Sequence, residues 1–310
     1  MTSRSETGQP RSRALAITAA VLAVFLFGAS FVAIKVALNQ VDPLTLIPIR
    51  FGLGLLMLWP LLLMRGRFER LSVVELVRTA SLGGLSILFN QWFQAGAMLR
   101  ADATTASWLS ALAPAFMALL AWIFLRERIT SWQWLGILLA MCGALLVSGA
   151  DPASTLGRAG WIAPTLLIFS ALAWAVFSVF GKAESLRTSP LRATVLAMSW
   201  AFLFSLILNG FSGGAWAVAA WQMRTWEALI FLGIACTGIA YALYFYALSG
   251  APSALVAALQ YLEPLITIVL AFFLLQERFR LIGLAGGLLI IGGILLVERT
   301  GSQTPLNLNR

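Results

Sequence analysis

Histidine is absent from the 310 residues, and only two cysteines are present, Cys142 and Cys236. Both cysteines lie deep in apolar runs, where a thiol more often packs as a small hydrophobic group than pairs or binds a metal. Because imidazole and thiolate are the usual ligands of zinc and haem iron, sites of these kinds are excluded. No cofactor or metal is expected.

Charged residues are also scarce. They make up 11% of the chain, whereas an ordinary soluble domain has about 25%. Hydrophobic residues make up 60%, which is more than one core with a polar surface accommodates. The composition therefore indicates an integral membrane protein whose solvent is the lipid bilayer. The net charge of +9 is scattered between apolar runs without a basic face or arm, so nucleic acid is not an expected partner.

Long apolar stretches make up most of the sequence. A helix that crosses a bilayer needs about 20 mostly apolar residues. Ten stretches qualify: 15–38, 45–64, 75–99, 102–125, 131–149, 160–181, 190–209, 226–248, 252–275 and 281–297. The first is longer than a secretory signal core and no soluble domain follows it, so we interpret it as a retained span. The sequence thus predicts an all-α integral membrane protein with ten transmembrane helices.

The placement of Arg and Lys predicts the orientation, because cytoplasmic loops carry an excess of both. With a cytoplasmic N-terminus, fourteen of these residues fall in inside segments and five in outside segments. We therefore expect a multi-pass protein of the bacterial inner membrane with both termini in the cytoplasm.

The chain also repeats itself. Shifted by 150 residues, 97–147 lies over 247–297 without a gap, and about a third of the positions match. Leu and Ala matches carry little weight in apolar sequence. The more informative matches are Pro114 on Pro264, Glu127-Arg128 on Glu277-Arg278, Gly136 on Gly286 and Gly143 on Gly293.

The beginnings of the two halves match more weakly. Phe27–Lys35 resembles Trp174–Lys182, and each half then reaches a Pro-x-Arg, at Pro48–Arg50 and Pro190–Arg192. Because five helices are an odd number, the second copy must enter the membrane from the opposite side. Two five-helix repeats of inverted topology are therefore predicted, an organisation typical of many secondary transporters.

The sequence resembles the EamA-type ten-helix permeases of the drug/metabolite transporter superfamily. The resemblance rests on FGASFVAIK (Phe27–Lys35), APAFMALLAWIFLRERITSWQWLGILLAMCGALLV (Ala113–Val147), TGIAYALYFYAL (Thr237–Leu248) and LEPLITIVLAFFLLQERFRLIGLAGGLLIIGGILLV (Leu262–Val297). It covers nearly the whole chain beyond the first dozen residues, although Phe27 stands where the family often has Trp. It implies transport of metabolites, amino acids or drugs, often export, through a cavity between the halves.

Four segments follow from the repeat and the resemblance. Residues 1–13 and 299–310 are expected to be cytoplasmic tails, and residues 14–150 and 160–298 the two repeats.

Glu263 is the first candidate for a functional residue, because it lies near the middle of the ninth span. A carboxylate at that depth usually faces a cavity or a partner. It could bind a cationic group or exchange protons during transport; alternatively, it is a protonated group hydrogen-bonded within the bundle. The repeat places Ala113 at its position, so the carboxylate occurs in one half only.

Pro264 and its counterpart Pro114 should kink or loosen their helices, because each removes a backbone hydrogen bond and clashes with the carbonyl four residues back. The loosened segment forms either a polar binding surface, a hinge or a packing kink.

Other polar residues recur at helical spacing, as in Ser86, Asn90 and Gln94. Such stripes should face the bundle interior, where they either line a cavity or form interhelical hydrogen bonds. The predicted substrate-binding set is Glu263, Gln260, Tyr241, Tyr244, Asn90, Gln94, Trp108 and Trp174.

The remaining charges inside or beside the spans have local interpretations. Lys35 and Lys182 are expected to snorkel to the membrane boundary, and Glu277 to pair with Arg278. Arg50 is expected to snorkel or to pair with Asp42, with a substrate role as the alternative.

The function that fits best is a secondary transporter of a small organic solute, with export by alternating access and possible proton coupling. The alternative is a membrane enzyme acting on a lipid, but the cluster of catalytic side chains that it needs is missing. A channel would need rings of like charge or a carbonyl filter, and neither is present. Substrate identity and oligomeric state are left open.

The predicted topology places residues 67 and 158 on opposite sides of the membrane. With Cys142 and Cys236 replaced, Arg67→Cys should therefore react with an impermeant thiol reagent from the cytoplasmic side, and Arg158→Cys only from the other. Labelling of both from the same side of intact cells or vesicles would contradict the ten-helix prediction.

Overall fold

A computed structural model describes residues 13–64, 71–125, 130–149, 161–212, 218–251, 256, 259–277 and 281–301. These residues form helices joined by short connections. In chain order the elements are α1 Arg13–Ala37, α2 Pro43–Met64, α3 Val73–Ser81, the π-helical η1 Leu82–Leu88, α4 Phe89–Met98, α5 Ala103–Ser110, α6 Ala113–Leu125, α7 Ser131–Gly149, α8 Ile162–Arg187, α9 Pro190–Phe211, the short 3₁₀ turn η3 Val218–Ala220, α10 Met223–Ile230, the π-helical η4 Phe231–Ile239, α11 Ala240–Gly250, α13 Leu262–Leu275 and α14 Leu281–Gly301.

Six helical stretches of the described chain are long and apolar enough to cross a membrane. They are Ala14–Ala37, Pro43–Met64, Val73–Met98, Ile162–Ser185, Pro190–Phe211 and Met223–Gly250. They coincide with six of the ten predicted spans. Shorter apolar helices, Trp134–Gly143, Leu262–Leu275 and Leu281–Gly293, lie within three others. The chain is thus an all-helical, multi-pass membrane protein.

The fourth predicted span, 102–125, is not one continuous helix. It divides at Ala111–Leu112 into α5 and α6, and Pro114 lies in the first turn of α6. Pro264 likewise lies in the first turn of α13, just after a turn at Gln260–Tyr261. A proline is tolerated in a first turn, where its missing N–H has no intrahelical acceptor. Each helix is interrupted just before its proline, where the sequence predicted loosening, but the proline begins the following helix and does not lie within a continuous one. Much of the beginning of the predicted span 252–275 lies outside the described residues.

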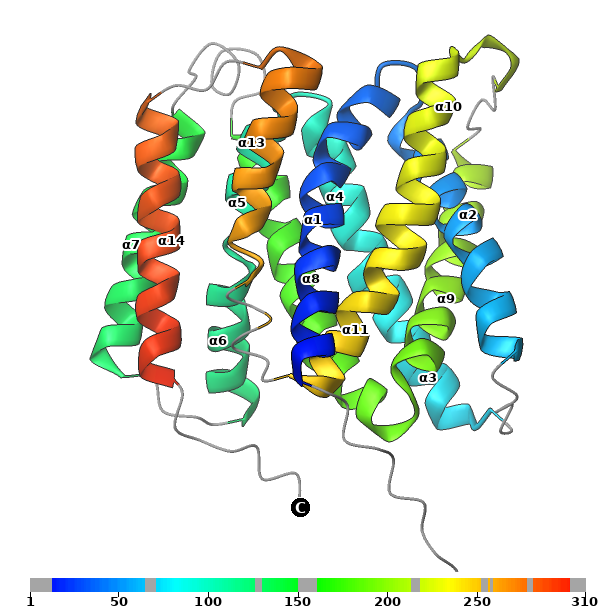
Figure 1. The fold of residues 1–310 in the computed structure, drawn as a ribbon, viewed down its shortest axis with the longest axis horizontal. Coiled ribbons are helices and arrows are strands. Elements are labelled where there is room, and N and C mark those ends of the chain that lie inside the picture. Colours follow the sequence, from blue (N-terminus) through cyan, green and yellow to red (C-terminus); the bar gives the residue numbers. More distant parts are fainter. Residues whose placement is uncertain are drawn as a thin grey trace, which may run out of the picture.

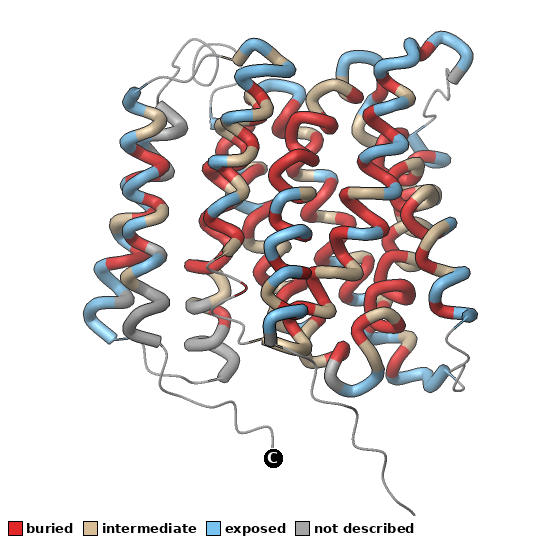
Figure 2. Tube along the Cα trace, in the orientation of Figure 1, coloured by how far each residue is buried: buried red, intermediate tan, exposed pale blue. Residues whose placement is uncertain are grey.

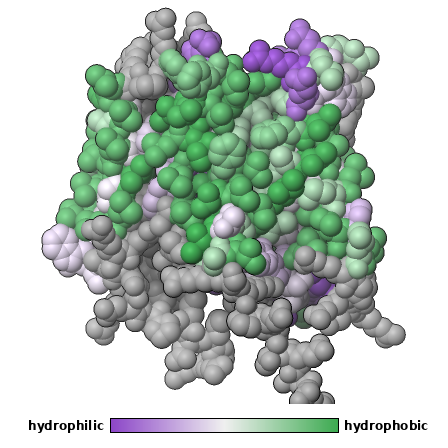
Figure 3. Space-filling model, viewed as in Figure 1, coloured by the Kyte–Doolittle hydropathy of each residue, from purple (hydrophilic) through white to green (hydrophobic). Residues whose placement is uncertain are grey.

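The helices run side by side in one bundle (Figure 1). α7 and α14 pair at one edge, whereas α1 lies centrally and packs against α11 and α13. Buried residues are concentrated on the inner faces of these central helices (Figure 2). On the face shown in Figure 3, apolar side chains form a broad band, with hydrophilic side chains along its upper edge. The exposed band suits a lipid environment.

The contact between α7 and α14 is reciprocal. A Cβ atom added at Gly143 would come within 2.5 Å of the carbonyl oxygen of Gly286 and 2.7 Å of the amide nitrogen of Ile290. One added at Gly293 would meet the carbonyl of Gly136 and the amide of Ala140 in the same way. These residue pairs match under the 150-residue shift, so each helix presents the same close-packing surface to the other.

The two π-helical segments are also equivalent. η1 packs against α9, and η4 packs against α2. Gly83 of η1 lies against the carbonyl of Ala197, and Gly233 of η4 lies against the carbonyl of Arg50. In both places a glycine lets one backbone approach another closely.

The glycine contacts predict a difference between two neighbouring residues of α14. Gly293→Ala should lower the free energy of unfolding by about 1–3 kcal/mol, because the methyl group would overpack the α7 contact. Gly292→Ala is the matched control, since a Cβ atom there meets nothing within 4 Å. The higher helix propensity of alanine should leave that variant as stable as the parent or more stable by up to about 1 kcal/mol. Thermal unfolding in detergent compares the two, and equal midpoints would contradict the packing assigned to α7 and α14.

Candidate functional site

A cavity of about 50 Å³ lies inside the bundle, between α1, α2, α4, α8, α11 and the two helix breaks. Both halves of the chain contribute to its wall. Six of the eight predicted residues line it: Asn90, Gln94, Trp174, Tyr241, Gln260 and Glu263.

The other two predicted residues lie outside the cavity wall. Trp108 is buried, and its ring packs at Gly287 of α14. The Tyr244 hydroxyl lies 2.9 Å from Oγ of Ser178, while its ring packs against Phe27 and Trp174. In this conformation both residues support the wall from behind. The binding role of the eight residues stays a prediction.

Arg50 is the cavity residue that the sequence interpretation placed wrongly. It neither snorkels nor pairs with Asp42: its side chain is only 1% exposed, and Asp42 instead accepts a hydrogen bond from the amide of Thr45. Its Nε donates to Oγ1 of Thr237 at 2.6 Å, and its Nη1 donates to Oε1 of Gln91. Both acceptors are neutral. Within the described part of the chain, the Arg50 guanidinium has no carboxylate within ion-pair distance.

Gln91 was not predicted, because it does not follow α-helical spacing from the other polar residues of its span. It is five residues after Ser86, off the stripe of Ser86, Asn90 and Gln94. Ser86 belongs to η1, and a π-helix brings residues five apart onto one face. Gln91 therefore joins the interior face, where its Nε2 donates to Oδ1 of Asn90 at 2.8 Å and to the Tyr241 hydroxyl at 3.3 Å.

Arg50 has no arginine counterpart in the second half, contrary to the Pro-x-Arg match. The equivalent contacts of Gly83 and Gly233 pair Arg50 with Ala197, a shift of 147 residues. The same shift pairs Phe27–Lys35 with Trp174–Lys182. Arg192 has a different role, because its Nε and Nη2 donate to the Glu75 carboxylate at 2.6 and 2.8 Å. The sequence match therefore brought together two arginines in unrelated places.

Glu263 lies in the first turn of α13 and is half-buried at the cavity. Its carboxylate makes no hydrogen bond or ion pair within the described part of the chain, whereas its backbone carbonyl accepts from Oγ1 of Thr267 at 2.9 Å. The N-terminal end of a helix carries partial positive charge, which favours a carboxylate at this position. The site therefore holds one arginine and one glutamate. Neither side chain forms an ion pair with a described residue of opposite charge.

Two more polar groups at the cavity have no partner. Among the described residues, the buried side-chain atoms without a hydrogen bond are Oγ of Ser110 and Nε2 of Gln260. Each residue lies four positions before a helix-breaking proline, and the two are equivalent under the 150-residue shift. Buried polar atoms are rarely left unpaired, so water or a solute is the expected partner.

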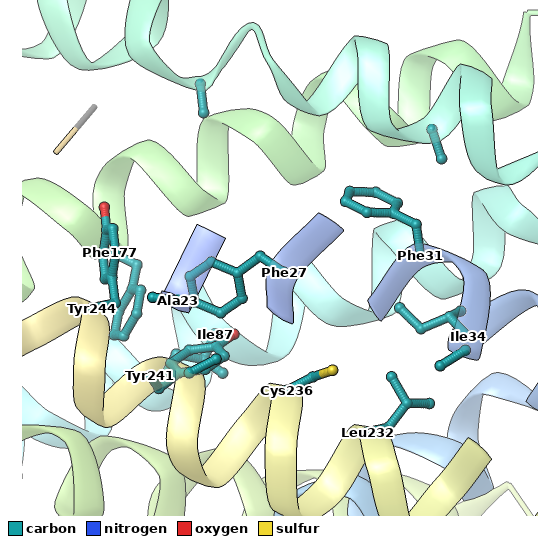
Figure 4. Close-up of a cluster of buried hydrophobic side chains, with 14 of the residues drawn as sticks. Ala23, Phe27, Phe31, Ile34, Ile87, Phe177, Leu232, Cys236, Tyr241 and Tyr244 are labelled. Atoms are coloured by element: carbon teal, nitrogen blue, oxygen red, sulfur yellow. The ribbon is translucent and has the colours of Figure 1, made fainter. Parts of the chain in front are cut away.

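Aromatic rings form the rest of the wall, with Phe27 at their centre. Its ring centroid lies 5.4 Å from those of both Trp174 and Tyr241, in edge-to-face arrangements. Figure 4 shows the Phe27 ring next to Tyr241, with Tyr244 and Phe177 to one side. This apolar surface faces the same cavity as the charged and amide groups.

The polar stripes also make interhelical hydrogen bonds, the alternative left open by the sequence. Nδ2 of Asn90 donates to the backbone carbonyl and to Oγ of Ser170, both at 3.0 Å. Oγ1 of Thr267 donates to the carbonyl of Gly28 at 2.8 Å. Asn90 does both things, since it also lines the cavity. The two interpretations are therefore compatible.

One end of the bundle is held by two charged side chains that were expected to act locally. Nζ of Lys35 donates to the carbonyls of Met98 and Ala101, both at 2.7 Å, rather than snorkelling. The Glu277 carboxylate accepts from the amide of Ala103 at 2.9 Å and from the amide and hydroxyl of Thr104 at 3.1 and 2.8 Å. These bonds join α1 and the end of α13 to the end of α4, the start of α5 and the connection between them. The expected partner Arg278 lies outside the described residues.

Comparison with known proteins gives a consistent result. The EamA-like transporter family matches the chain twice, over residues 14–149 and 161–299. The chain is 30% identical to an uncharacterized transporter of Archaeoglobus fulgidus, over 91% of this chain and 96% of that protein. It is also 30% identical to a probable terminal-alkyne amino-acid exporter of Streptantibioticus cattleyicolor, over 92% and 93%. A probable amino-acid metabolite efflux pump of Salmonella typhimurium is 30% identical over 89% and 92%. One solved crystal structure, 18% identical, has the same fold with a TM-score of 0.70, covering 94% of this chain and 100% of that one.

The buried network predicts that Gln91 supports the site. Gln91→Met should lower the free energy of unfolding by about 1–3 kcal/mol, because it removes the acceptor from a buried guanidinium and leaves that donor unpaired. Gln222→Met is the control, since its side chain is exposed. A denaturation series in detergent measures both, and equal stability of the two variants would contradict the network.

Proposed function

Because the chain belongs to the EamA-like transporter family, we propose that it exports a small amino-acid-derived metabolite through the central cavity by alternating access. The observation that carries the proposal is a cavity inside an apolar bundle, lined by polar and aromatic side chains from both halves. The names of the relatives from Streptantibioticus and Salmonella support the substrate class and the direction of transport. Family membership also sets aside the lipid-directed enzyme, because this is a family of transporters.

The proposed topology has ten transmembrane helices in two five-helix repeats, residues 14–150 and 160–298, of inverted orientation. It is supported by the reciprocal glycine contacts of α7 with α14 and of the two π-helical segments with α2 and α9. In this arrangement α5 and α6 together form the fourth span, broken at its middle. The excess of Arg and Lys in alternate connections supports a bacterial inner-membrane protein with both termini in the cytoplasm.

The cavity volume supports a cycle with more than one conformation. Ligand pockets usually measure about 300–1,000 Å³, whereas this cavity measures about 50 Å³. A metabolite enters only if the aromatic wall and the helix breaks move apart. The bonds of Lys35 and Glu277 hold the helices together at one end of the bundle, so the movement that admits a metabolite would start at the other end. Inverted repeats provide the second state, in which the opposite end closes.

Glu263 is the proposed coupling residue. It is the titratable carboxylate of the cavity wall, and no cation of the described chain holds it in the ionised form. A carboxylate that binds a proton in one state and releases it in the other would drive export with the inward proton gradient.

Transport by purified protein in liposomes tests the function. We expect saturable transport of at least one of the twenty amino acids or their acylated and aromatic derivatives, faster when a pH gradient is imposed. Glu263→Gln should abolish the effect of the gradient, because the amide does not exchange a proton. Glu227→Gln is the matched control, since Glu227 is exposed on α10.

Two results would contradict the proposal. The first is that no compound of the panel moves faster than in protein-free liposomes. The second concerns coupling alone: a Glu263→Gln protein that responds to the pH gradient as the parent does would exclude Glu263 as the coupling residue.

A further inference from the structure

The cavity wall contains two opposite charges that do not neutralise each other. Arg50, on α2, makes two hydrogen bonds to neutral groups, and no carboxylate of the described chain pairs with its guanidinium. Glu263, at the start of α13, has an unbonded carboxylate that faces the same cavity. Arginine stays charged even when buried, so its uncompensated charge in the bundle calls for an anion.

The donors on Arg50 show where that anion would bind. A guanidinium has five N–H groups in a planar fork, and the bonds to Thr237 and Gln91 start from Nε and Nη1. In the described structure Nη2 makes no hydrogen bond, although the residue lines the cavity. A guanidinium edge of this kind matches a carboxylate, whose oxygens accept charge-assisted hydrogen bonds.

Gln260 supplies a second independent donor for the same group. It is only 5% exposed, it lines the cavity, and its Nε2 makes no hydrogen bond within 3.5 Å, although the amide lies near the Tyr244 hydroxyl. It precedes Glu263 by three residues and does not donate to that carboxylate, so the Glu263 oxygens also remain available. The wall therefore offers unpaired donors and one unpaired acceptor with negative charge.

We infer that Arg50 and Glu263 recognise the two poles of a zwitterionic solute, its carboxylate at Arg50 and its ammonium group at Glu263. The inference rests on the proposed export function. It adds that the charges of a solute decide whether it is transported. In the state in which Glu263 is ionised, a solute with a carboxylate alone leaves Glu263 uncompensated, and one with an amine alone leaves Arg50 uncompensated. Only a zwitterion satisfies both, and the rings of Phe27 and Trp174 then receive its apolar side chain.

The repeat supports a single orientation of the solute. Arg50 corresponds to Ala197 and Glu263 corresponds to Ala113, so neither charge has a copy in the other half. The two halves have equivalent helix contacts, but they contribute different charged residues to the cavity. A dipolar solute bound between one cation and one anion has one preferred direction in such a cavity.

The test uses matched solutes that differ only in charge. The probes are L-phenylalanine, L-leucine and L-threonine, each with its carboxamide, which lacks the carboxylate, and its deaminated acid, which lacks the ammonium group. Transport efficiency is measured in liposomes containing the full chain. For each parent that is transported, both analogues should be at least about tenfold poorer, the effect of one lost charge-assisted hydrogen bond.

Variants then assign each charged group of the solute to its residue. The quantity compared is the ratio of transport efficiencies between a parent amino acid and its analogue. Arg50→Gln should reduce the parent-to-carboxamide ratio to near one and leave the parent-to-deaminated-acid ratio high. Glu263→Gln should do the reverse, and Arg50→Lys should restore part of the first ratio. A variant that lowers the transport of all solutes by the same factor leaves both ratios unchanged and contradicts the assignment of that residue. Arg100→Gln, at an exposed position, is the control and should preserve both ratios.

The outcomes separate the inference from the proposed function. Transport of parents and single-charge analogues with equal efficiency would overturn the inference and leave the export function standing. Transport of single-charge analogues alone, or unchanged ratios in Arg50→Gln and Glu263→Gln, would overturn it as well. If neither these probes nor the wider metabolite panel is transported, both proposals are wrong.

Discussion

The burial of the Arg50 guanidinium among neutral partners is the constraint around which the centre of the molecule is organised. A permanent charge inside an apolar bundle is costly unless hydrogen bonds surround it. Its acceptors come from different halves of the chain, Gln91 from α4 and Thr237 from η4. The backbone of Arg50 is also in close contact, because Gly233 packs against its carbonyl. One residue thus joins the two repeats through both its side chain and its main chain.

The π-helical segments make this network possible. In a regular α-helix, residues five apart such as Ser86 and Gln91 would lie on different faces. The wider turn of η1 brings Gln91 inward, where it bridges Arg50, Asn90 and Tyr241. η4 likewise presents Thr237 to Arg50. The π-helical turns therefore occur next to the residues that bond Arg50, and they change the direction in which the following side chains point.

The composition and the apolar runs were sufficient to predict an all-helical membrane protein, and the proline positions predicted where helices loosen. Glu263 and five other residues of the cavity wall were predicted from the same rules of depth and spacing. Gln91 did not, because a fixed helical period hides a π-helical shift. Arg50 was misplaced because the sequence does not reveal whether an arginine inside a span reaches a boundary or finds partners. The false match with Arg192 arose from a two-residue pattern, and only the glycine contacts gave the correct alignment.

Glu277 has a consequence for how the protein is made. Its carboxylate bonds the first amide groups of α5, at Ala103 and Thr104, about 170 residues earlier in the chain. Ribosomes synthesise the N-terminal half first, so α5 must enter the membrane with these amides still unbonded by their final partner. Three parts of the first half reach their final partners only after the second half has been made: the α5 amides at Glu277, Arg50 at Thr237 and the α7 surface at α14. Interruption of synthesis after the first repeat would leave a fragment with its polar groups exposed to lipid, which is a natural target for membrane quality control.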